Sequence, residues 1–258
     1  MGLGMVTYDF SGKVALVTGA AGGIGRATAL AFAASGAAVT VADIDEDGVR
    51  ETAELIEKNG GQALAVRTDV ADSRSVKEMV DTTVRTFGGL DFAHNNAGIV
   101  GAGAPVAEMP DEVWERGIAI MLSGVFYGMK HEIPAIAARG GGAIVNTSSG
   151  AGLIGFPDMA NYVAAKHGVL GLTKTAALEC IGKNIRINAI CPGTAHSRMV
   201  DEWIGGDPAA EKQVADLHPI GRIADPAEIA ASVLWLCSDA ASFVVGIALP
   251  VDGGYTIP

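Results

Sequence analysis

Apolar runs and amphipathic stretches alternate along the chain. Val14–Thr18 and Ala38–Ala42 are short and rich in β-branched residues, which is typical of central parallel strands covered on both faces. A helical pattern extends between them through Ala33, and Ser35-Gly36 ends it. Further strands are predicted at Ala63–Arg67, Leu90–Ala93, Ala143–Asn146, Arg186–Ile190 and Phe243–Val251, and further helices at Asp45–Lys58, Ser73–Phe87, Pro110–Ala138, Ala160–Glu179 and Asp225–Cys237.

This alternation predicts an α/β fold. Strands that alternate with helices form a doubly wound parallel sheet with helices on both faces, here with about seven strands. No stretch of the sequence resembles a linker, so we expect a single domain over residues 1–258, which begins with a short lead-in over residues 1–9. The 258 residues are 49% hydrophobic, which is enough for one core.

Composition narrows the choice of partner. Lysine and arginine together number 18 against 29 aspartate and glutamate residues, so the net charge is −11. We therefore expect a small-molecule partner, and neither nucleic acid nor a membrane. The uncharged run Ala27–Ala42 is shorter than the ~20 residues of a membrane span. Cys180, Cys191 and Cys237 lie in apolar segments without metal-ligand spacing, and we expect reduced core thiols, no metal and a cytoplasmic protein.

A glycine-rich segment follows the first predicted strand directly. Residues 19–25 read Gly-Ala-Ala-Gly-Gly-Ile-Gly and open the first helix. Glycines let the backbone turn sharply and approach a pyrophosphate, whose charge meets the free N–H groups and the positive end of the helix dipole. The order of strand, glycines and helix therefore predicts a dinucleotide site.

Asp43 ends the second predicted strand. A carboxylate there can accept hydrogen bonds from both hydroxyls of the adenosine ribose and would repel a 2′-phosphate, which favours NAD over NADP as the cofactor. An ordinary solvated acid of an acidic loop is the alternative interpretation.

Three polar side chains that follow the predicted strand Ala143–Asn146 are candidates for the chemistry. Ser149 follows this strand, and Tyr162 and Lys166 are four residues apart on the next predicted helix, hence on one face. A free phenol titrates near pH ~10, and a neighbouring ammonium stabilises the phenolate. We expect Lys166 to lower the pKa of Tyr162 and so make it a proton acceptor, with Ser149 on the same substrate oxygen.

The sequence resembles the short-chain dehydrogenase/reductase family from about residue 10 to residue 255. The motifs that carry the resemblance are Thr18-Gly19 with Gly23-Ile24-Gly25, Asn95-Asn96-Ala97-Gly98, Ser149, and Tyr162 with Lys166. The resemblance implies a Rossmann-type fold, Ser149 as the hydrogen-bonding partner of the substrate oxygen, and Tyr162 as acid/base. It also implies that Lys166 tunes Tyr162 and binds the nicotinamide ribose.

Further cofactor contacts are implied by the same resemblance. Asp69 and Val70 match the adenine-contacting pair of the family, although Asp69 taken alone predicts an N-cap for the helix that begins at Ser73. Asn95 is expected to tie neighbouring strands together, and His94 beside it is expected to be structural. The implied cofactor-binding residues are Gly19, Gly23, Ile24, Gly25, Asp43, Asp69, Val70, Asn96, Ala97, Gly98, Tyr162, Lys166, Pro192, Gly193 and Ser197. Relatives that use NADP tend to carry a basic residue where this chain has Gly22 or Ile44.

One position departs from the pattern of the family. Met121 stands where the family has an Asn that is counted among its catalytic residues and helps to hold a water beyond the lysine. A thioether is a weak acceptor and no donor. If the backbone carbonyl performs the role, Met121 preserves it, whereas if the amide is needed, the proton relay is slower or another polar group such as Ser123 replaces it. We expect activity to survive with a slower proton step.

Together these features predict an NAD-dependent dehydrogenase of secondary alcohols. Residues 196–218, with Met199, Trp203 and Ile204, are predicted to form a substrate lid, which favours an apolar or alicyclic substrate, and a surface insertion is the alternative. A carbonyl or 3-oxoacyl reductase that uses NADPH and a catalytically silent NAD-binding regulatory protein are the alternative functions. The resemblance also implies a homo-oligomer, a dimer or tetramer built through the helices that begin at Pro110 and Ala160.

Overall fold

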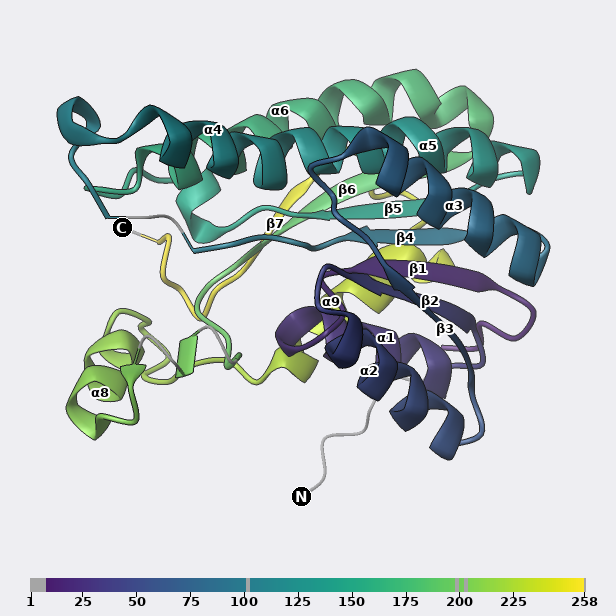
Figure 1. Cartoon of the computed structure of the whole chain (residues 1–258), viewed down its shortest axis with the longest axis horizontal. Coiled ribbons are helices and arrows are strands. Elements are labelled where there is room, and N and C mark those ends of the chain that lie inside the picture. The colour runs from purple at the N-terminus through teal and green to yellow at the C-terminus, as the bar shows by residue number, and fades with distance from the viewer. Residues whose placement is uncertain (1–7, 101–102, 198–199, 202–203, 258) are drawn as a thin grey trace.

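Seven parallel strands form one sheet with helices on both faces, as the sequence predicts (Figure 1). The computed structural model describes residues 8–100, 103–197, 200–201 and 204–257. The strands lie in the order β3-β2-β1-β4-β5-β6-β7. Their bounds are β1 Val14–Thr18, β2 Ala38–Asp43, β3 Gln62–Arg67, β4 Phe92–Asn95, β5 Gly142–Thr147, β6 Ile185–Pro192 and β7 Ala248–Val251.

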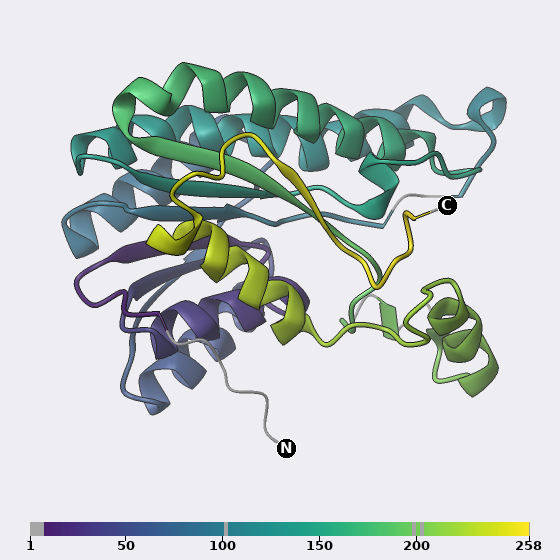
Figure 2. The same cartoon turned by 180° about the vertical axis from the view of Figure 1, so that it is seen from behind.

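The helices cover the two faces of this sheet in separate groups. Helices α1, α2 and α9 lie on one face, and α3 to α6 lie on the other (Figures 1 and 2). Their bounds are α1 Gly23–Ala34, α2 Glu46–Lys58, α3 Ser73–Phe87, α4 Asp111–Ile118, α5 Gly124–Ala138, α6 Ala160–Cys180, α8 Pro208–Asp216 and α9 Pro226–Cys237.

Alternating side chains of the strands supply a core on each face. In β1, Ala15 and Val17 join the cluster under α1 and α9, whereas Val14 and Leu16 join the cluster under α3, α5 and α6. All four are buried, because a central parallel strand is covered on both sides. This double burial explains why the strand reads as a continuous apolar run.

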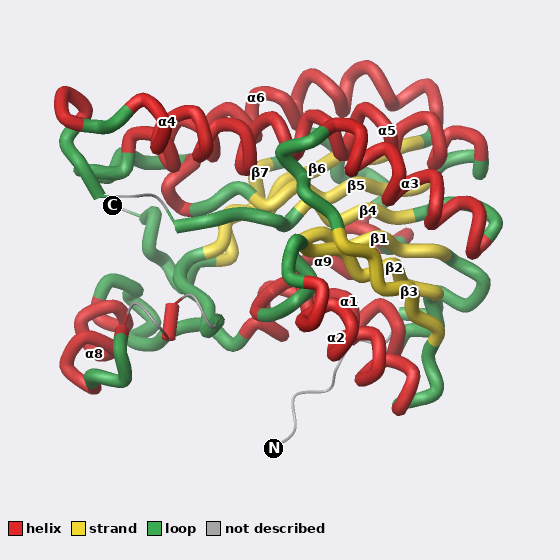
Figure 3. The backbone as a smooth tube through the Cα atoms, viewed as in Figure 1, coloured by secondary structure: helices red, strands yellow, loops and turns green. Residues whose placement is uncertain are grey.

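The strand order reverses between β1 and β4. β1 pairs with β2 on one side and with β4 on the other, so the connections that leave β1 and β4 diverge to opposite faces. The loops that follow β4, β5 and β6 leave the sheet on the same side (Figure 3). Ligands of open α/β sheets bind at such a switch point, outside the carboxyl ends of the strands.

Three predicted elements differ most from the structure. The strand predicted at Leu90–Ala93 lies two residues later, and the carboxylate of Asp91, just before it, accepts from the Val14 amide of β1 (2.9 Å). The last strand covers only Ala248–Val251, because Gly246 turns the chain with a φ of 72°. The helix predicted at Pro110–Ala138 is divided by a π-helical turn at Ala119–Ser123.

The predicted lid contains a helix that the sequence interpretation missed. Asp207 accepts a hydrogen bond from Ala209 N and Pro208 occupies the first turn, so the signals for the start of α8 are present in the sequence. Figures 1 and 2 show α8 apart from the sheet, beyond the ends of β6 and β7. Met199 and Trp203 lie outside the described residues. The extent of the single domain and the lid role of 196–218 stay predictions.

Within the described ranges, no helix has both the length and the hydrophobicity that a bilayer crossing requires.

Candidate active site

The glycine-rich loop after β1 is packed so tightly that glycine is required at two positions. Gly19 has a φ of +67°, and a Cβ there would lie 2.9 Å from Ala97 Cα. A Cβ on Gly25 would overlap the carbonyl oxygen of Gly19. The Thr18 hydroxyl accepts from the backbone amides of Asn96 (2.9 Å) and Ala97 (3.1 Å). The structure therefore brings the loop and the segment after β4 together.

The start of α1 fits a bound phosphate. No side chain among the described residues caps this helix, whereas α2 and α3 are capped by the carboxylates of Asp45 and Asp72. Gly22 has extended backbone, and a Cβ built on it would meet nothing within 4 Å. The N–H groups of the first turn therefore lack side-chain acceptors among the described residues, which suits the pyrophosphate of a dinucleotide.

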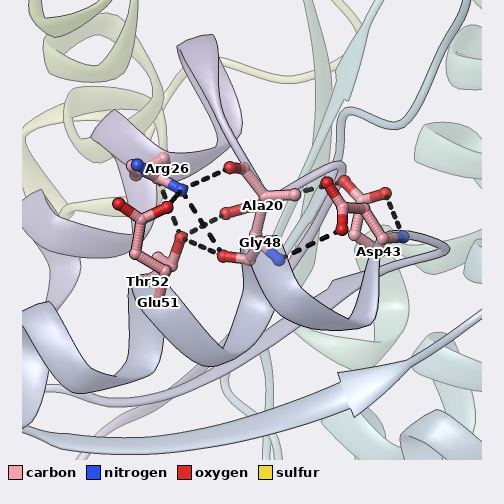
Figure 4. A network of polar contacts seen from close by, with 8 residues as sticks. Ala20, Arg26, Asp43, Gly48, Glu51 and Thr52 are labelled. Carbon is pink, nitrogen blue, oxygen red and sulfur yellow. Dashed lines mark hydrogen bonds and ion pairs between the residues drawn. The ribbon is translucent and has the colours of Figure 1, made fainter.

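Asp43 lies at the tip of β2, beside this loop. Its carboxylate accepts hydrogen bonds from the backbone amides of Ala21 (3.2 Å) and Asp45 (3.1 Å) (Figure 4). These bonds orient the half-buried carboxylate next to the glycine-rich loop, where the sequence predicts the ribose contact.

A basic side chain also lies near the loop, and it is paired with a carboxylate. Arg26 forms an ion pair with Glu51 (2.5 Å) and donates to the Ala21 carbonyl (2.6 Å) and the Thr52 hydroxyl (3.0 Å) (Figure 4). Thr52 in turn donates to the Ala20 carbonyl (2.8 Å). The guanidinium therefore braces the loop against α2.

The structure tests the roles predicted for Asp69, which follows β3, and for Asn95, which ends β4. Asp69 accepts from Ala71 N (2.9 Å), and the N-cap of α3 is Asp72, so the capping role predicted for Asp69 is wrong. Asp72 is nearer to the first turn and reaches Arg74 N. Asn95 donates to Asn146 of β5 (3.0 Å), which confirms that it ties neighbouring strands together.

Ser149, Tyr162 and Lys166 converge where β5 ends and α6 begins. The Ser149 hydroxyl lies near the Tyr162 phenol and acts to lower its pKa, and Ala151 N donates to the Ser149 hydroxyl (3.1 Å). The Lys166 ammonium lies 5.6 Å from the centre of the Tyr162 ring and donates to the Thr147 carbonyl (2.9 Å). Ser148 holds the helix against the strand by donating to the Lys166 carbonyl (2.8 Å).

The pKa of Tyr162 does not fall as the sequence interpretation expects. Burial raises the pKa of the phenol, and the neighbouring Ser149 hydroxyl opposes this rise only in part. Burial also lowers the pKa of Lys166 to about 8. The ammonium lies over the ring face and donates to a backbone carbonyl, so desolvation dominates both groups in the protein alone.

Met121 is fully buried within the π-helical turn Ala119–Ser123. A Cβ built on Gly98 would lie 3.9 Å from Met121 Cγ and 3.7 Å from Lys166 Nζ. The thioether side chain and the ammonium therefore flank the same small residue. π-Helical turns occur frequently at functional sites, and sequence periodicity alone gave no sign of this one.

The turn after β6 meets the glycine-rich loop from the other side. A Cβ on Gly23 would lie 3.0 Å from Ser197 Cβ, so these two predicted cofactor residues are neighbours. Gly193 leaves room for His218, whose Nε2 accepts from Thr194 N (3.0 Å). Val70 packs against Gly124 of α5, Ile24 packs on the core under α1, and Pro192 is buried at the end of β6.

Sequence reasoning missed an aromatic stack beside Ser149. Tyr255 stacks on Phe156 with ring centres 5.6 Å apart, and on His218 at 5.0 Å. A Cβ on Gly150 would lie 3.1 Å from the Tyr255 ring, so the stack adjoins the residue after Ser149. The three rings come from distant segments, and no sequence pattern links them.

The described residues hold no cluster of His, Cys, Asp or Glu that could bind a metal ion. All three cysteines are buried, and burial raises the pKa of Cys191 to about 11 and that of Cys237 to about 12. Both of these thiols therefore stay protonated near neutral pH.

Comparison with known proteins places this site in a family. Residues 19–256 match the family described as enoyl-(acyl carrier protein) reductase. Cyclohexanol dehydrogenase of Acinetobacter sp. (strain SE19) is 47% identical over 252 residues, 98% of this chain and 98% of that protein. Cis-4-hydroxycyclohexanecarboxylate dehydrogenase of Sinomonas cyclohexanicum is 46% identical over 248 residues, 96% of this chain and 98% of that protein. The crystal structure of 3-ketoacyl-(acyl-carrier-protein) reductase from Brucella melitensis complexed with NADH has a TM-score of 0.89 at 32% identity and covers 96% of this chain and 100% of that chain.

The doubly wound sheet, the glycine-rich loop and the polar groups beside it define a dinucleotide-binding oxidoreductase. The chain belongs to the short-chain dehydrogenase/reductase family, which confirms the resemblance seen in the sequence. It is an oxidoreductase that transfers a hydride between a nicotinamide cofactor and a secondary alcohol or its ketone.

Proposed function

We propose that the protein oxidises apolar, alicyclic secondary alcohols with NAD. The observation that carries this proposal is the convergence of Ser149, Tyr162 and Lys166 at the end of β5, beside a glycine-rich loop that fits a pyrophosphate. A phenol, a hydroxyl and an ammonium at one place can hold an alcohol oxygen and take its proton.

The side chains of the site divide the reaction between them. NAD, when bound, accepts the hydride and brings a positive charge near the phenol. Ser149 donates a hydrogen bond to the substrate oxygen, and Tyr162 Oη takes the hydroxyl proton. Lys166 keeps positive charge beside the phenol and so offsets the burial that raises the pKa of Tyr162. Met121 supplies no donor to this set.

The aromatic stack supports an apolar ring as the substrate. Phe156 and Tyr255 adjoin Ser149 through Gly150, and flat apolar surfaces pack well against an alicyclic ring. Leu153 and Ile154 lie between Ser149 and Phe156 and are more than one-third exposed, so apolar surface is available at this place. The two relatives named above, a cyclohexanol dehydrogenase and a cis-4-hydroxycyclohexanecarboxylate dehydrogenase, agree with this substrate class.

Two features near the loop favour NAD over NADP. The Asp43 carboxylate lies beside the loop and would repel a 2′-phosphate. Arg26, the basic side chain next to the loop, is already paired with Glu51. The Brucella relative was crystallised with NADH, which agrees with this preference.

The test is NADH formation from a panel of secondary alcohols, with cyclohexanol and linear alcohols of equal carbon number compared. We expect turnover to favour the ring substrates and NAD, and Tyr162→Phe to lower kcat by about 10²–10⁴-fold while NADH still binds. Turnover of ketones with NADPH alone would support the alternative of a carbonyl or 3-oxoacyl reductase. Tight NADH binding without turnover of any alcohol or ketone would support the silent regulatory protein.

Assembly and location complete the proposal. Trp114 of α4, Phe126 of α5 and Leu178 of α6 are exposed to 41%, 46% and 76%, so these helices offer apolar surface to a second copy of the chain. We propose a cytoplasmic homo-oligomer, a dimer or tetramer, that light scattering in solution would identify.

A further inference from the structure

His94 occupies an unusual place for a merely structural residue. It lies on β4 with no exposed surface, and its Nε2 is 2.8 Å from the Thr147 hydroxyl on β5. Its Nδ1 finds no hydrogen-bond partner among the residues that the structure describes. An unpaired buried nitrogen weakens a core, and a leucine of similar size would fill the space without that loss. The imidazole is therefore poorly explained by packing alone.

The hydrogen bonds around His94 have a fixed direction. The Asn96 amide nitrogen lies within reach of two carbonyl oxygens, those of Thr18 (3.2 Å) and Gly19 (3.4 Å), so it must be the donor. Asn96 Oδ1 is then an acceptor, and it takes the single proton of the Thr147 hydroxyl (3.3 Å). Thr147 Oγ1 has no second proton to give, so His94 Nε2 carries the proton that it donates to Thr147.

This directed chain ends under the glycine-rich loop. Asn96 Nδ2 would lie 2.9 Å from a Cβ on Gly19 and 2.9 Å from one on Gly25, so the amide fills the space below both glycines. Thr147 is a branch point, because its backbone carbonyl accepts from Lys166 (2.9 Å) while its hydroxyl links His94 and Asn96. One strand end thus connects the loop and the candidate acid/base group.

We infer that His94 is a positioning residue for the dinucleotide site: it donates to Thr147 and thereby fixes the Asn96 amide that holds the carbonyls of Thr18 and Gly19. This inference rests on the proposed function, since the loop matters only if it binds a dinucleotide. These hydrogen bonds fix the conformation of the loop before the nucleotide binds, and a loop that is already ordered binds with a smaller loss of conformational entropy. His94 touches neither cofactor nor substrate.

Two variants of His94 separate positioning from packing. His94→Gln keeps an amide donor near the Nε2 position, whereas His94→Leu keeps the volume and removes the donor. For His94→Leu we expect about tenfold weaker NADH binding, measured by fluorescence titration, with a smaller effect on kcat. His94→Gln is expected to restore most of the affinity. In nucleotide-free protein, amide hydrogen exchange of residues 18–25 should be faster in His94→Leu than in His94→Gln.

Thr147→Val breaks the same chain at its middle and serves if His94→Leu does not fold. The double variant is expected to bind NADH about as weakly as either single variant, because one broken link suffices. The matched control is Thr83→Val, which removes a buried hydroxyl bonded to Thr40 (2.9 Å) away from the site. We expect it to lose stability and to keep the NADH affinity of the parent.

The inference would be overturned if His94→Leu or Thr147→Val kept the NADH affinity and the loop exchange rates of the parent. It would also be overturned if His94→Gln lost as much NADH affinity as His94→Leu, or if the Thr83→Val control lost as much as either. Failure of the proposed function looks different. A parent protein that binds neither NADH nor NADPH would refute that function, while the exchange experiment would still report whether His94 holds the loop.

Discussion

Lys166 holds its ammonium over the face of the Tyr162 ring, 5.6 Å from the ring centre, and not at the phenol oxygen. In this position the cation acts on the phenol through space, while it donates a hydrogen bond to the Thr147 carbonyl. Burial raises the pKa of Tyr162, and under the proposed function the positive charge of Lys166 would lower it toward a working range.

Removal of this charge should move the pH profile. In Lys166→Met the phenol loses a nearby cation, so its pKa rises, and the rising limb of kcat for alcohol oxidation is expected at higher pH than in the parent. We also expect kcat at pH 8 to fall by about 10²-fold or more. Steady-state rates between pH 6 and 10 measure both effects. Lys174→Met changes an exposed lysine of the same helix and should leave the profile in place. An unmoved limb in Lys166→Met would show that the cation does not tune Tyr162.

Met121→Asn tests the departure from the pattern of the family. An amide beside Gly98 and Lys166 restores a donor and an acceptor near the ammonium, so we expect a faster proton step. The gain in kcat should be below about tenfold, with a smaller solvent deuterium isotope effect. Met121→Leu is the apolar control and should match the parent. Equal kcat and isotope effects in all three proteins would show that the amide has no role here.

Asp43 is expected to set the choice of nucleotide. Asp43→Ala removes the acceptor of the ribose hydroxyls and the charge that repels a 2′-phosphate. We expect KM for NAD to rise by about 10- to 100-fold, the range for a lost hydrogen bond to a charged group, and KM for NADP to fall. Asp47→Ala, at a surface carboxylate that is 91% exposed, should change neither value. An Asp43→Ala protein with the parental ratio of the two KM values would refute this role.

Two buried groups should oppose each other in the pH dependence of stability. Burial lowers the pKa of His94 to about 3 and raises that of Glu132 to about 7. The contribution of His94 to the free energy of unfolding is complete above its unfolded pKa of 6.5 and is lost as pH falls toward 3. That of Glu132 is complete below 4.5 and is lost as pH rises through 7. Between pH 4.5 and 6.5 the two groups therefore change the free energy of unfolding with pH in opposite directions, and their effects cancel.

Glu132→Gln separates these two contributions. The variant keeps an acceptor for Asn95, which donates to Glu132 at 2.9 Å in the parent, and it cannot ionise. Its free energy of unfolding in urea should equal that of the parent below pH 4.5 and exceed it by about 3 kcal/mol at pH 8. Equal stability of parent and variant at both pH values would mean that Glu132 is ionised with an ordinary pKa in the folded protein.

Much of this architecture could be predicted because local signals agree with the global fold. β1, α3 and α9 have the predicted bounds within one residue, since each combines a clear apolar pattern with a terminal glycine or an aspartate cap. The glycine-rich loop and the pair Tyr162 and Lys166 could be located for a similar reason, because fixed spacing along a strand or helix is visible in sequence.

The remaining features depend on tertiary contacts. The π-helical turn at Met121 interrupts a helix whose apolar pattern reads as continuous, and the direction of the Tyr162 pKa is set by burial, which sequence spacing does not measure. The chain from His94 to Asn96 joins segments that are adjacent only because β4 and β5 pair. Helix α8 is different, because the sequence contains its N-cap aspartate and first-turn proline but the helix was not predicted.

The uncapped start of α1 makes the lifetime of the enzyme depend on its ligand. Under the proposed function, a dinucleotide supplies the acceptors that no described side chain provides, so it binds the folded chain and not the unfolded one. At a concentration one hundred times its Kd, such a ligand adds about 2.7 kcal/mol to the free energy of unfolding. Molecules deprived of nucleotide would unfold and be degraded first, so the amount of enzyme in a cell would follow the supply of the compound that it consumes.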